Sequence, residues 1–251
     1  MFPDIAAPKM PIAIRTEHIV DENTTFRVQQ HGKGLSSAKF TIFGPCRDVA
    51  TDKSLHATNA AFAESQRQCR TSSSSSTSTP SKQSQQPLMS VDGKYASMDG
   101  RRSFFDASGL PLFDLYHRPV AVTWYVELPG RKEKNKDESS ATPIARIMPR
   151  FSIFKDNLEV SVRNAADHGE EVTLRVQGQD IWKQRTNVYL GEKVVMTAKR
   201  TDKMSTYLPG KKLEWIVDIA AGMDMSLASV IVVVLAANMY DSAGQASRSS
   251  S

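Results

Sequence analysis

The feature that most constrains the fold is a C-terminal run that is apolar on every side of a helical wheel. It extends from Met225 to Tyr240, and a helix of this kind has to be enclosed, because a surface helix keeps one polar face. Its sixteen residues would span about 24 Å as a helix. The hydrocarbon core of a bilayer is about 30 Å thick, so a membrane anchor is disfavoured and no transmembrane span is expected.

The secondary structure of this run stays open when it is judged from its residues alone. The five consecutive β-branched residues from Val230 to Val234 favour a buried strand. Asp224 precedes the run as a plausible N-cap, and the Ala236-Ala237 pair suits a helix. Both assignments remain possible at this point.

The rest of the ordered sequence alternates between apolar and polar residues, which predicts antiparallel β-sheet with one buried face. The first strands are expected at 24–30 and 38–44, and turn dipeptides such as Ser108-Gly109 and His168-Gly169 separate later ones. About ten to twelve strands are expected, which favours a barrel or a sandwich. The expected buried faces are Val120, Val122, Trp124, Val126 and Leu128; Leu158, Val160 and Val162; Val172, Leu174 and Val176; and Leu213, Trp215, Val217 and Ile219.

Composition divides the chain into one domain and several segments of low order. We expect a single barrel domain over residues 21–240, preceded by a flexible N-terminus at 1–20 and followed by a disordered tail at 241–251. The serine-rich stretch 51–87 predicts a disordered insertion, because it cannot bury enough apolar surface to offset its ordering entropy. A phosphorylation-regulated linker is the alternative. Residues 130–142 carry mixed charge and predict a solvated loop.

Two sequence motifs resemble a known family. The stretch Arg102 to Leu115 contains the pattern D-x-x-G-x-P-L-x-x-L, and Trp215 to Leu227 leads through a Gly-x-Asp turn into the aliphatic run. Both resemble LURP-one-related proteins, which belong to the Tubby C-terminal-like superfamily together with phospholipid scramblases. The resemblance implies a closed antiparallel barrel of about twelve strands with the C-terminal hydrophobic helix at its centre. The strand faces that carry Trp124 and Trp215 would then line the helix.

The sequence offers no recognisable catalytic chemistry. Its five histidines are scattered and its two cysteines lie apart, so neither a metal site nor another cofactor is expected. The serine-nucleophile and phosphate-loop patterns are missing as well. Asp106 and Asp114 flank a hairpin, where Asp106 is expected to organise the turn through its own hydrogen bonds. We therefore expect a protein that is not an enzyme.

The most informative polar feature is basic. Eight Lys and Arg residues lie between 183 and 212, in a chain whose net charge is +5. Lys183 and Arg185 are two residues apart on one expected strand and so share a face. Tubby proteins bind phosphoinositide headgroups through a Lys-x-Arg pair, which Lys183-Gln184-Arg185 resembles. The alternative is a solvated basic barrel wall, and nucleic acid is not expected because interleaved aromatic residues are missing. The candidate anion or lipid-headgroup residues are Lys183, Arg185, Lys199 and Arg200.

These observations predict a binding or scaffold module for anionic phospholipid headgroups or for a protein partner. A scramblase-like membrane protein that uses the C-terminal hydrophobic segment is one alternative, and a nuclear regulatory protein is another. The opening stretch Met1 to Pro8 has an acid and two prolines where a signal peptide would be continuously apolar. An intracellular location is therefore expected, cytoplasmic with peripheral membrane or nuclear association. The oligomeric state stays open.

Overall fold

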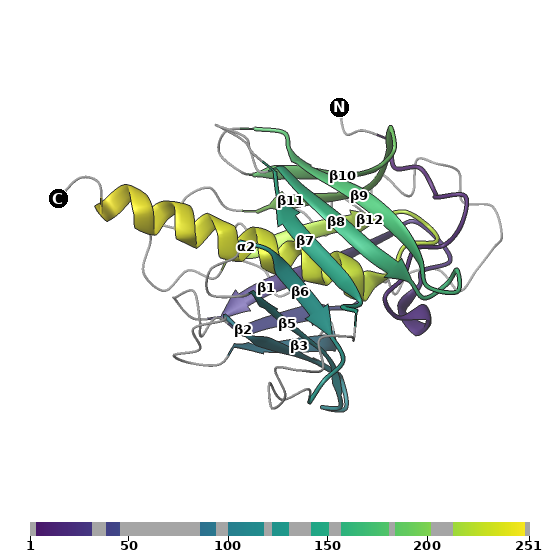
Figure 1. Cartoon of the computed structure of the whole chain (residues 1–251), viewed down its shortest axis with the longest axis horizontal. Coiled ribbons are helices and arrows are strands. Elements are labelled where there is room, and N and C mark those ends of the chain that lie inside the picture. Colours follow the sequence, from purple (N-terminus) through teal and green to yellow (C-terminus); the bar gives the residue numbers. More distant parts are fainter. Residues whose placement is uncertain are drawn as a thin grey trace, which may run out of the picture.

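The computed structural model describes residues 4–31, 39–45, 86–93, 100–117, 122–130, 142–150, 157–180, 184–201 and 213–248. Twelve antiparallel strands close into one barrel, in the order β1-β12-β11-β10-β9-β8-β7-β6-β5-β4-β3-β2 (Figure 1). The strands are β1 (Thr24–His31), β2 (Lys39–Phe43), β3 (Pro87–Gly93), β4 (Arg102–Asp106), β5 (Pro111–His117), β6 (Trp124–Glu127), β7 (Ala145–Pro149), β8 (Asn157–Asn164), β9 (Glu170–Gly178), β10 (Arg185–Leu190), β11 (Lys193–Arg200) and β12 (Glu214–Ile219). A short 3-10 helix, η1 (Thr16–His18), precedes them and the helix α2 (Met225–Arg248) follows.

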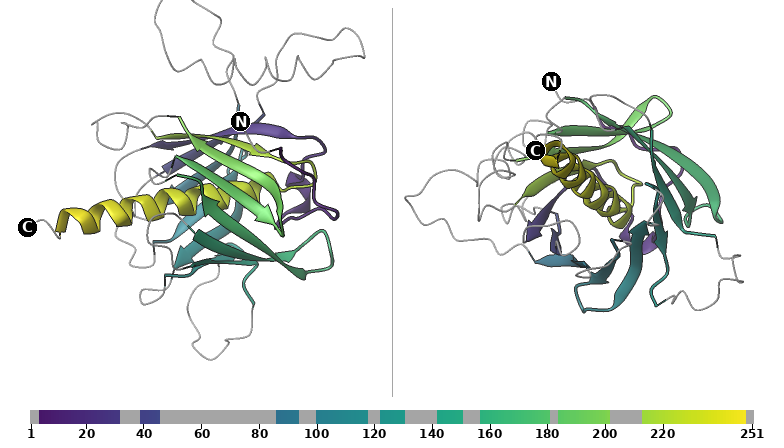
Figure 2. Two further views of the ribbon diagram at one scale, coloured as in Figure 1. Left: turned by 90° about the horizontal axis from the view of Figure 1, so that it is seen from above. Right: turned by 60° about the vertical axis from the view of Figure 1, so that its left-hand side comes forward.

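The helix α2 runs through the middle of the barrel, as the family resemblance implied (Figure 2). Every residue from Met225 to Ala237 is buried. Trp124 and Trp215 lie on the buried, inward faces of their strands, as predicted. The enclosure also explains why this run is a helix despite its β-branched residues. A helix satisfies its backbone hydrogen bonds by itself, whereas a lone strand at the centre of a closed barrel would have no neighbour to pair with.

The barrel has two different ends. We call the end that holds the turn between β12 and α2, Ala220 to Asp224, the covered end. We call the opposite end, where β10 begins at Arg185 and β12 begins at Glu214, the exit end, because α2 leaves the barrel there. In Figures 1 and 2 the C-terminal half of α2 projects beyond the strands at the exit end.

Residues 4–20, the N-terminal strap, pack across the covered end. Ile12 and Ile19 form isolated β-bridges with Met223 and Asp224, and Ile12 and Ala13 are almost completely buried. The sequence predicted a flexible segment here, since two prolines and an acid obscure any periodic pattern. The strap is ordered because the short apolar stretch 12–14 covers the turn that starts α2.

Three other expectations differ in detail from the structure. The strand expected over Val120 to Leu128 is shorter, so that Val122 and Leu128 lie beyond the ends of β6 and are 73% and 64% exposed. The helix α2 continues to Arg248, through most of the expected tail at 241–251. The expected serine-rich insertion lies outside the described residues except for its last two, and residues 131–141 of the charged loop lie outside them as well.

Candidate functional site

The structure brings two of the four predicted site residues together. Arg185 begins β10 and Lys199 lies near the end of β11, and they are direct cross-strand partners at the exit end. Arg185 is exposed and Lys199 is half-buried on the outer wall. We call these two residues the outer cation pair. Lys183 lies outside the described residues.

Arg200 does not join the outer cation pair. Side chains alternate along a strand, so the neighbours Lys199 and Arg200 point to opposite faces of the barrel wall. Arg200 shares its face with the buried Met196 and Ala198, and only 8% of it is exposed. The four candidate residues therefore do not all lie on one surface, because strand geometry places Arg200 on the inner face and Lys199 on the outer face.

The outer cation pair belongs to a longer row across five neighbouring strands. Lys199 pairs in register with Ile216 on β12, Ile216 with Arg27 on β1, and Arg27 with Phe43 on β2. At about 4.8 Å per strand, the row from Arg185 to Phe43 spans about 19 Å. Arg27 was not among the residues predicted from the sequence. Its alternation with the buried Phe26 and Val28 was the available signal that it points outward.

Local contacts distinguish the two parts of this row. The guanidinium of Arg27 donates a 3.1 Å hydrogen bond to Glu214 and lies 4.2 Å from the ring centre of Phe43. Asp218, one row further from the exit end, accepts hydrogen bonds from the hydroxyls of Thr25 and Thr197 at 2.6 and 3.3 Å. The half of the row on β1 and β12 is thus partly neutralised by its own carboxylate.

A carboxylate also shapes the start of β10. Asp180 accepts the backbone N–H groups of Gln184 and Arg185 at 3.0 and 2.9 Å. These bonds hold the chain where it enters the strand and so fix the position of the Arg185 backbone. Arg185 and Lys199 are cross-strand partners, whose Cβ atoms typically lie about 5 Å apart, and such a pair suits an anion with two or more oxygens.

The inner wall at the exit end is also polar. Gln30 on β1 and Arg102 on β4 are almost completely buried and share the inward face of their strands with apolar residues. The guanidinium carbon of Arg102 lies 5.2 Å from the ring centre of Trp124. Gln30, Arg102 and Arg200 thus place polar side chains on the inner wall at the exit end. The rest of the inward faces of β1, β4 and β11 is mainly apolar.

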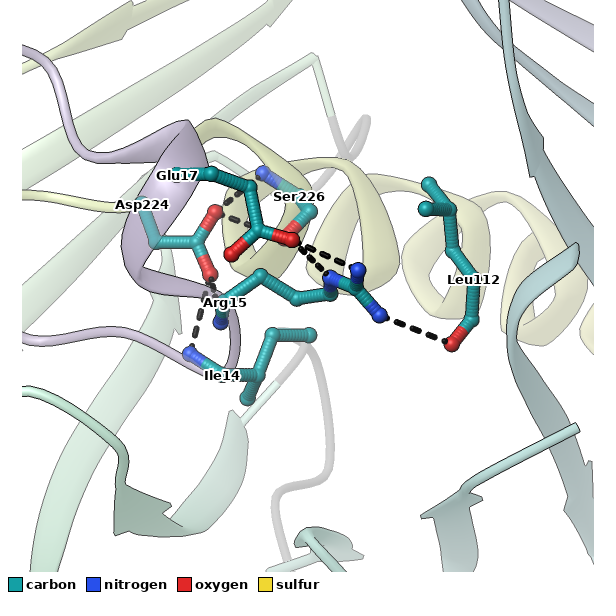
Figure 3. A network of polar contacts seen from close by, with 6 residues as sticks. All are labelled: Ile14, Arg15, Glu17, Leu112, Asp224 and Ser226. Atoms are coloured by element: carbon teal, nitrogen blue, oxygen red, sulfur yellow. Dashed lines mark hydrogen bonds and ion pairs between the residues drawn. The ribbon is translucent and has the colours of Figure 1, made fainter. Parts of the chain in front are cut away.

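The polar network at the covered end has a structural role (Figure 3). Asp224 is completely buried, and its Oδ1 accepts the N–H and the hydroxyl of Ser226, both at 2.6 Å. This contact confirms the expected N-cap of α2. The other oxygen, Oδ2, accepts the N–H groups of Ile14 and Arg15, both at 2.9 Å. Burial raises the pKa of Asp224, while the hydrogen bonds from Ser226, Arg15 and Ile14 oppose that rise.

The two aspartates of the hairpin between β4 and β5 are structural as well. Asp106 Oδ1 accepts the N–H and hydroxyl of Ser108 and the N–H of Leu110, which confirms its role in the turn. The Ser108 hydroxyl, and then the Leu110 N–H, lower the pKa of Asp106. Asp114 accepts a hydrogen bond from Ser103 at 2.6 Å and pairs with Arg101. In the part of the chain that the structure describes, no cluster of His, Cys, Asp and Glu has an arrangement that could hold a metal ion.

Comparison with known proteins identifies the family. The model of the LURP-one-related family matches residues 65–236, which is more than half of the chain. The chain belongs to the LURP-one-related family. A search of curated proteins finds no match. A crystal structure of an Arabidopsis thaliana protein is similar with a TM-score of 0.50 and 13% sequence identity, over 90% of this chain and 96% of that one. At that identity the similarity concerns the fold, and it agrees with the Tubby-like barrel.

The helix α2 was also assessed as a membrane span. Over the residues for which the structure gives a description, no helix is both long enough and apolar enough to cross a bilayer. The apolar residues of α2 from Met225 to Ala237 are buried inside the LURP-one-related barrel.

Proposed function

We propose that this LURP-one-related barrel is a binding module, not an enzyme, and that it contacts anionic phospholipid headgroups with its outer wall at the exit end. The observation that carries the proposal is the outer cation pair, in which Arg185 and Lys199 occupy directly opposed positions. A phosphate bound at this position could accept hydrogen bonds from both side chains. Arg supplies a planar fork of donors and Lys a compact charge.

The composition of the neighbouring row supports a lipid surface as the source of the phosphate. The row continues from Lys199 through the buried Ile216 to Arg27, so a third cationic residue lies on the same wall. Each cation near an anionic bilayer contributes about 1 kcal/mol to binding, and the contribution decays over a Debye length of about 8 Å in physiological salt. The outer cation pair would thus provide reversible, salt-sensitive association, while α2 stays inside the barrel.

Co-sedimentation with liposomes tests the proposal. Wild-type protein is expected to bind vesicles that contain phosphatidylinositol phosphates and to bind neutral phosphatidylcholine vesicles poorly, with the difference shrinking as salt rises. Arg185→Glu with Lys199→Glu should remove about 2 kcal/mol or more, which is a loss of at least about thirtyfold.

The matched control is Arg163→Glu with Lys193→Glu, which changes the net charge equally. Both residues are exposed and lie towards the covered end of the barrel. This variant should bind almost as well as the wild type. Equal binding to neutral vesicles, or equal losses in the two double variants, would contradict the proposal. A protein partner captured through the same pair would be the alternative outcome.

A further inference from the structure

Among the described residues, Gln30 on the inner wall has a buried side-chain amide with no hydrogen-bond partner at either its nitrogen or its oxygen. Only 1% of Gln30 is exposed, and it follows Phe26 and Val28 on the inward face of β1. Buried amides are almost always satisfied, so an unsatisfied one indicates a group that the protein itself does not provide. That group must both accept from Nε2 and donate to Oε1.

A cation lies on the same inner wall. Arg200 on β11 is in register with Trp215 on β12, and Trp215 is in register with Val28 on β1. Gln30 is two residues further along β1, where its backbone N–H donates to the carbonyl of Leu213. The backbones of Gln30 and Arg200 are thus about 10 Å apart across the strands and about 7 Å apart along them. Both side chains are long and lie on the inward face, and the strand that carries Trp215 separates their two strands.

We propose that the inner wall at the exit end binds a phosphate group between Gln30 and Arg200. The guanidinium of Arg200 donates to the ionised oxygens, and Gln30 Nε2 donates to another. A phosphate that still carries one proton donates that proton to Gln30 Oε1. The second pKa of a phosphomonoester is about 6, and that of inorganic phosphate is higher, so part of either group is still protonated near neutral pH. A carboxylate or a sulfate would leave Oε1 unsatisfied, because when ionised both only accept.

The inference stands apart from the outer cation pair, which lies on the other face of the wall. Inorganic phosphate and the phosphomonoester of a lipid headgroup share the required chemistry. Two experiments distinguish these two sources of phosphate. One measures binding of free inorganic phosphate, and the other compares binding to phosphatidic acid vesicles with binding to phosphatidylglycerol vesicles. Phosphatidylglycerol is a diester and has no proton to donate.

Thermal unfolding of the full chain in phosphate or sulfate at equal ionic strength tests the proposal. At a concentration about five times its Kd, phosphate should raise the unfolding midpoint by about 2–4 °C more than sulfate does. Gln30→Leu should abolish this difference and raise the midpoint without phosphate, because the unsatisfied amide is gone. Arg185→Glu with Lys199→Glu should keep the phosphate-specific gain, so failure here and failure of the lipid proposal are distinguishable.

Two results would overturn the inference. One is an equal effect of phosphate and sulfate on the wild type, which would indicate that a buried water satisfies Gln30. The other is a phosphate gain that survives in Gln30→Leu. If that variant does not fold, the ¹⁵N signals of the Gln30 side chain in the wild type decide the question. They should shift on titration with phosphate and stay in place with sulfate.

Discussion

The two ends of the barrel differ in how well their buried polar groups are hydrogen-bonded. At the covered end, Asp224 accepts four hydrogen bonds from the strap and from the first turn of α2. At the exit end, the Gln30 amide has no such partner among the described residues. Fully satisfied buried groups rigidify a structure, whereas unsatisfied groups are costly and are retained mainly where they serve a purpose. The covered end therefore contributes to stability, and the exit end is where we propose that binding takes place.

Truncation of α2 should cause the largest loss of stability. A chain that ends at Gly222 loses seven large apolar side chains of the core, from Leu227 to Leu235, whose burial is worth on the order of 10–20 kcal/mol. This exceeds the stability of a typical domain, about 5–15 kcal/mol. The truncated chain should be unfolded or insoluble by circular dichroism and fractionation.

A chain that ends at Asn238 is the matched control for this truncation. It keeps the buried part of α2 and lacks only residues beyond the exit end, so it should unfold with nearly wild-type cooperativity. If the chain ending at Gly222 stays folded and instead loses membrane association, α2 is an anchor and the assignment of the two ends fails.

Removing one oxygen of Asp224 should have the next largest effect. Asp224→Asn places an NH₂ group against one of the two pairs of donors, from Ile14 and Arg15 or from Ser226. The loss should be about 2–4 kcal/mol in the free energy of unfolding, measured by denaturant titration. Asp21→Asn removes the same charge from an exposed position before β1 and should change stability little. Equal losses in the two variants would remove the special role of the covered end.

The free energy of unfolding should also depend on pH, with a smaller effect whose direction follows from the pKa of Asp224. Because burial raises the pKa of Asp224, the folded protein holds this proton more tightly than the unfolded chain does. Its contribution to the free energy of unfolding should therefore fall as pH rises from the ordinary aspartate pKa through the raised value. The difference in free energy between wild type and Asp224→Asn, followed by denaturant titration between about pH 3 and pH 7, isolates this term. A difference that grows with pH would mean that the hydrogen bonds outweigh burial.

The sequence predicted the barrel better than it predicted the ends. The alternation around Trp215 and the turn bonds of Asp106 follow from local rules, and the family resemblance settled that the aliphatic run is a helix. The strap was missed because Pro8 and Pro11 interrupt any pattern, although the apolar stretch 12–14 was visible. Arg200 was misplaced on the wall because the cations were grouped by sequence position, although strand geometry separates it from Lys199.

The position of α2 has a consequence for how the molecule assembles. The element at the centre of the barrel follows all twelve strands in the chain, and the strap that covers its first turn precedes them. The contact between the strap and the first turn of α2 cannot form until residues more than 200 positions apart have met, as in the bonds from Ile14 and Arg15 to Asp224. Such distant pairings make folding slow and concentrate it after synthesis of the whole domain. Incompletely synthesised chains would lack α2 and expose the apolar inner wall of the barrel, so we expect them to bind chaperones.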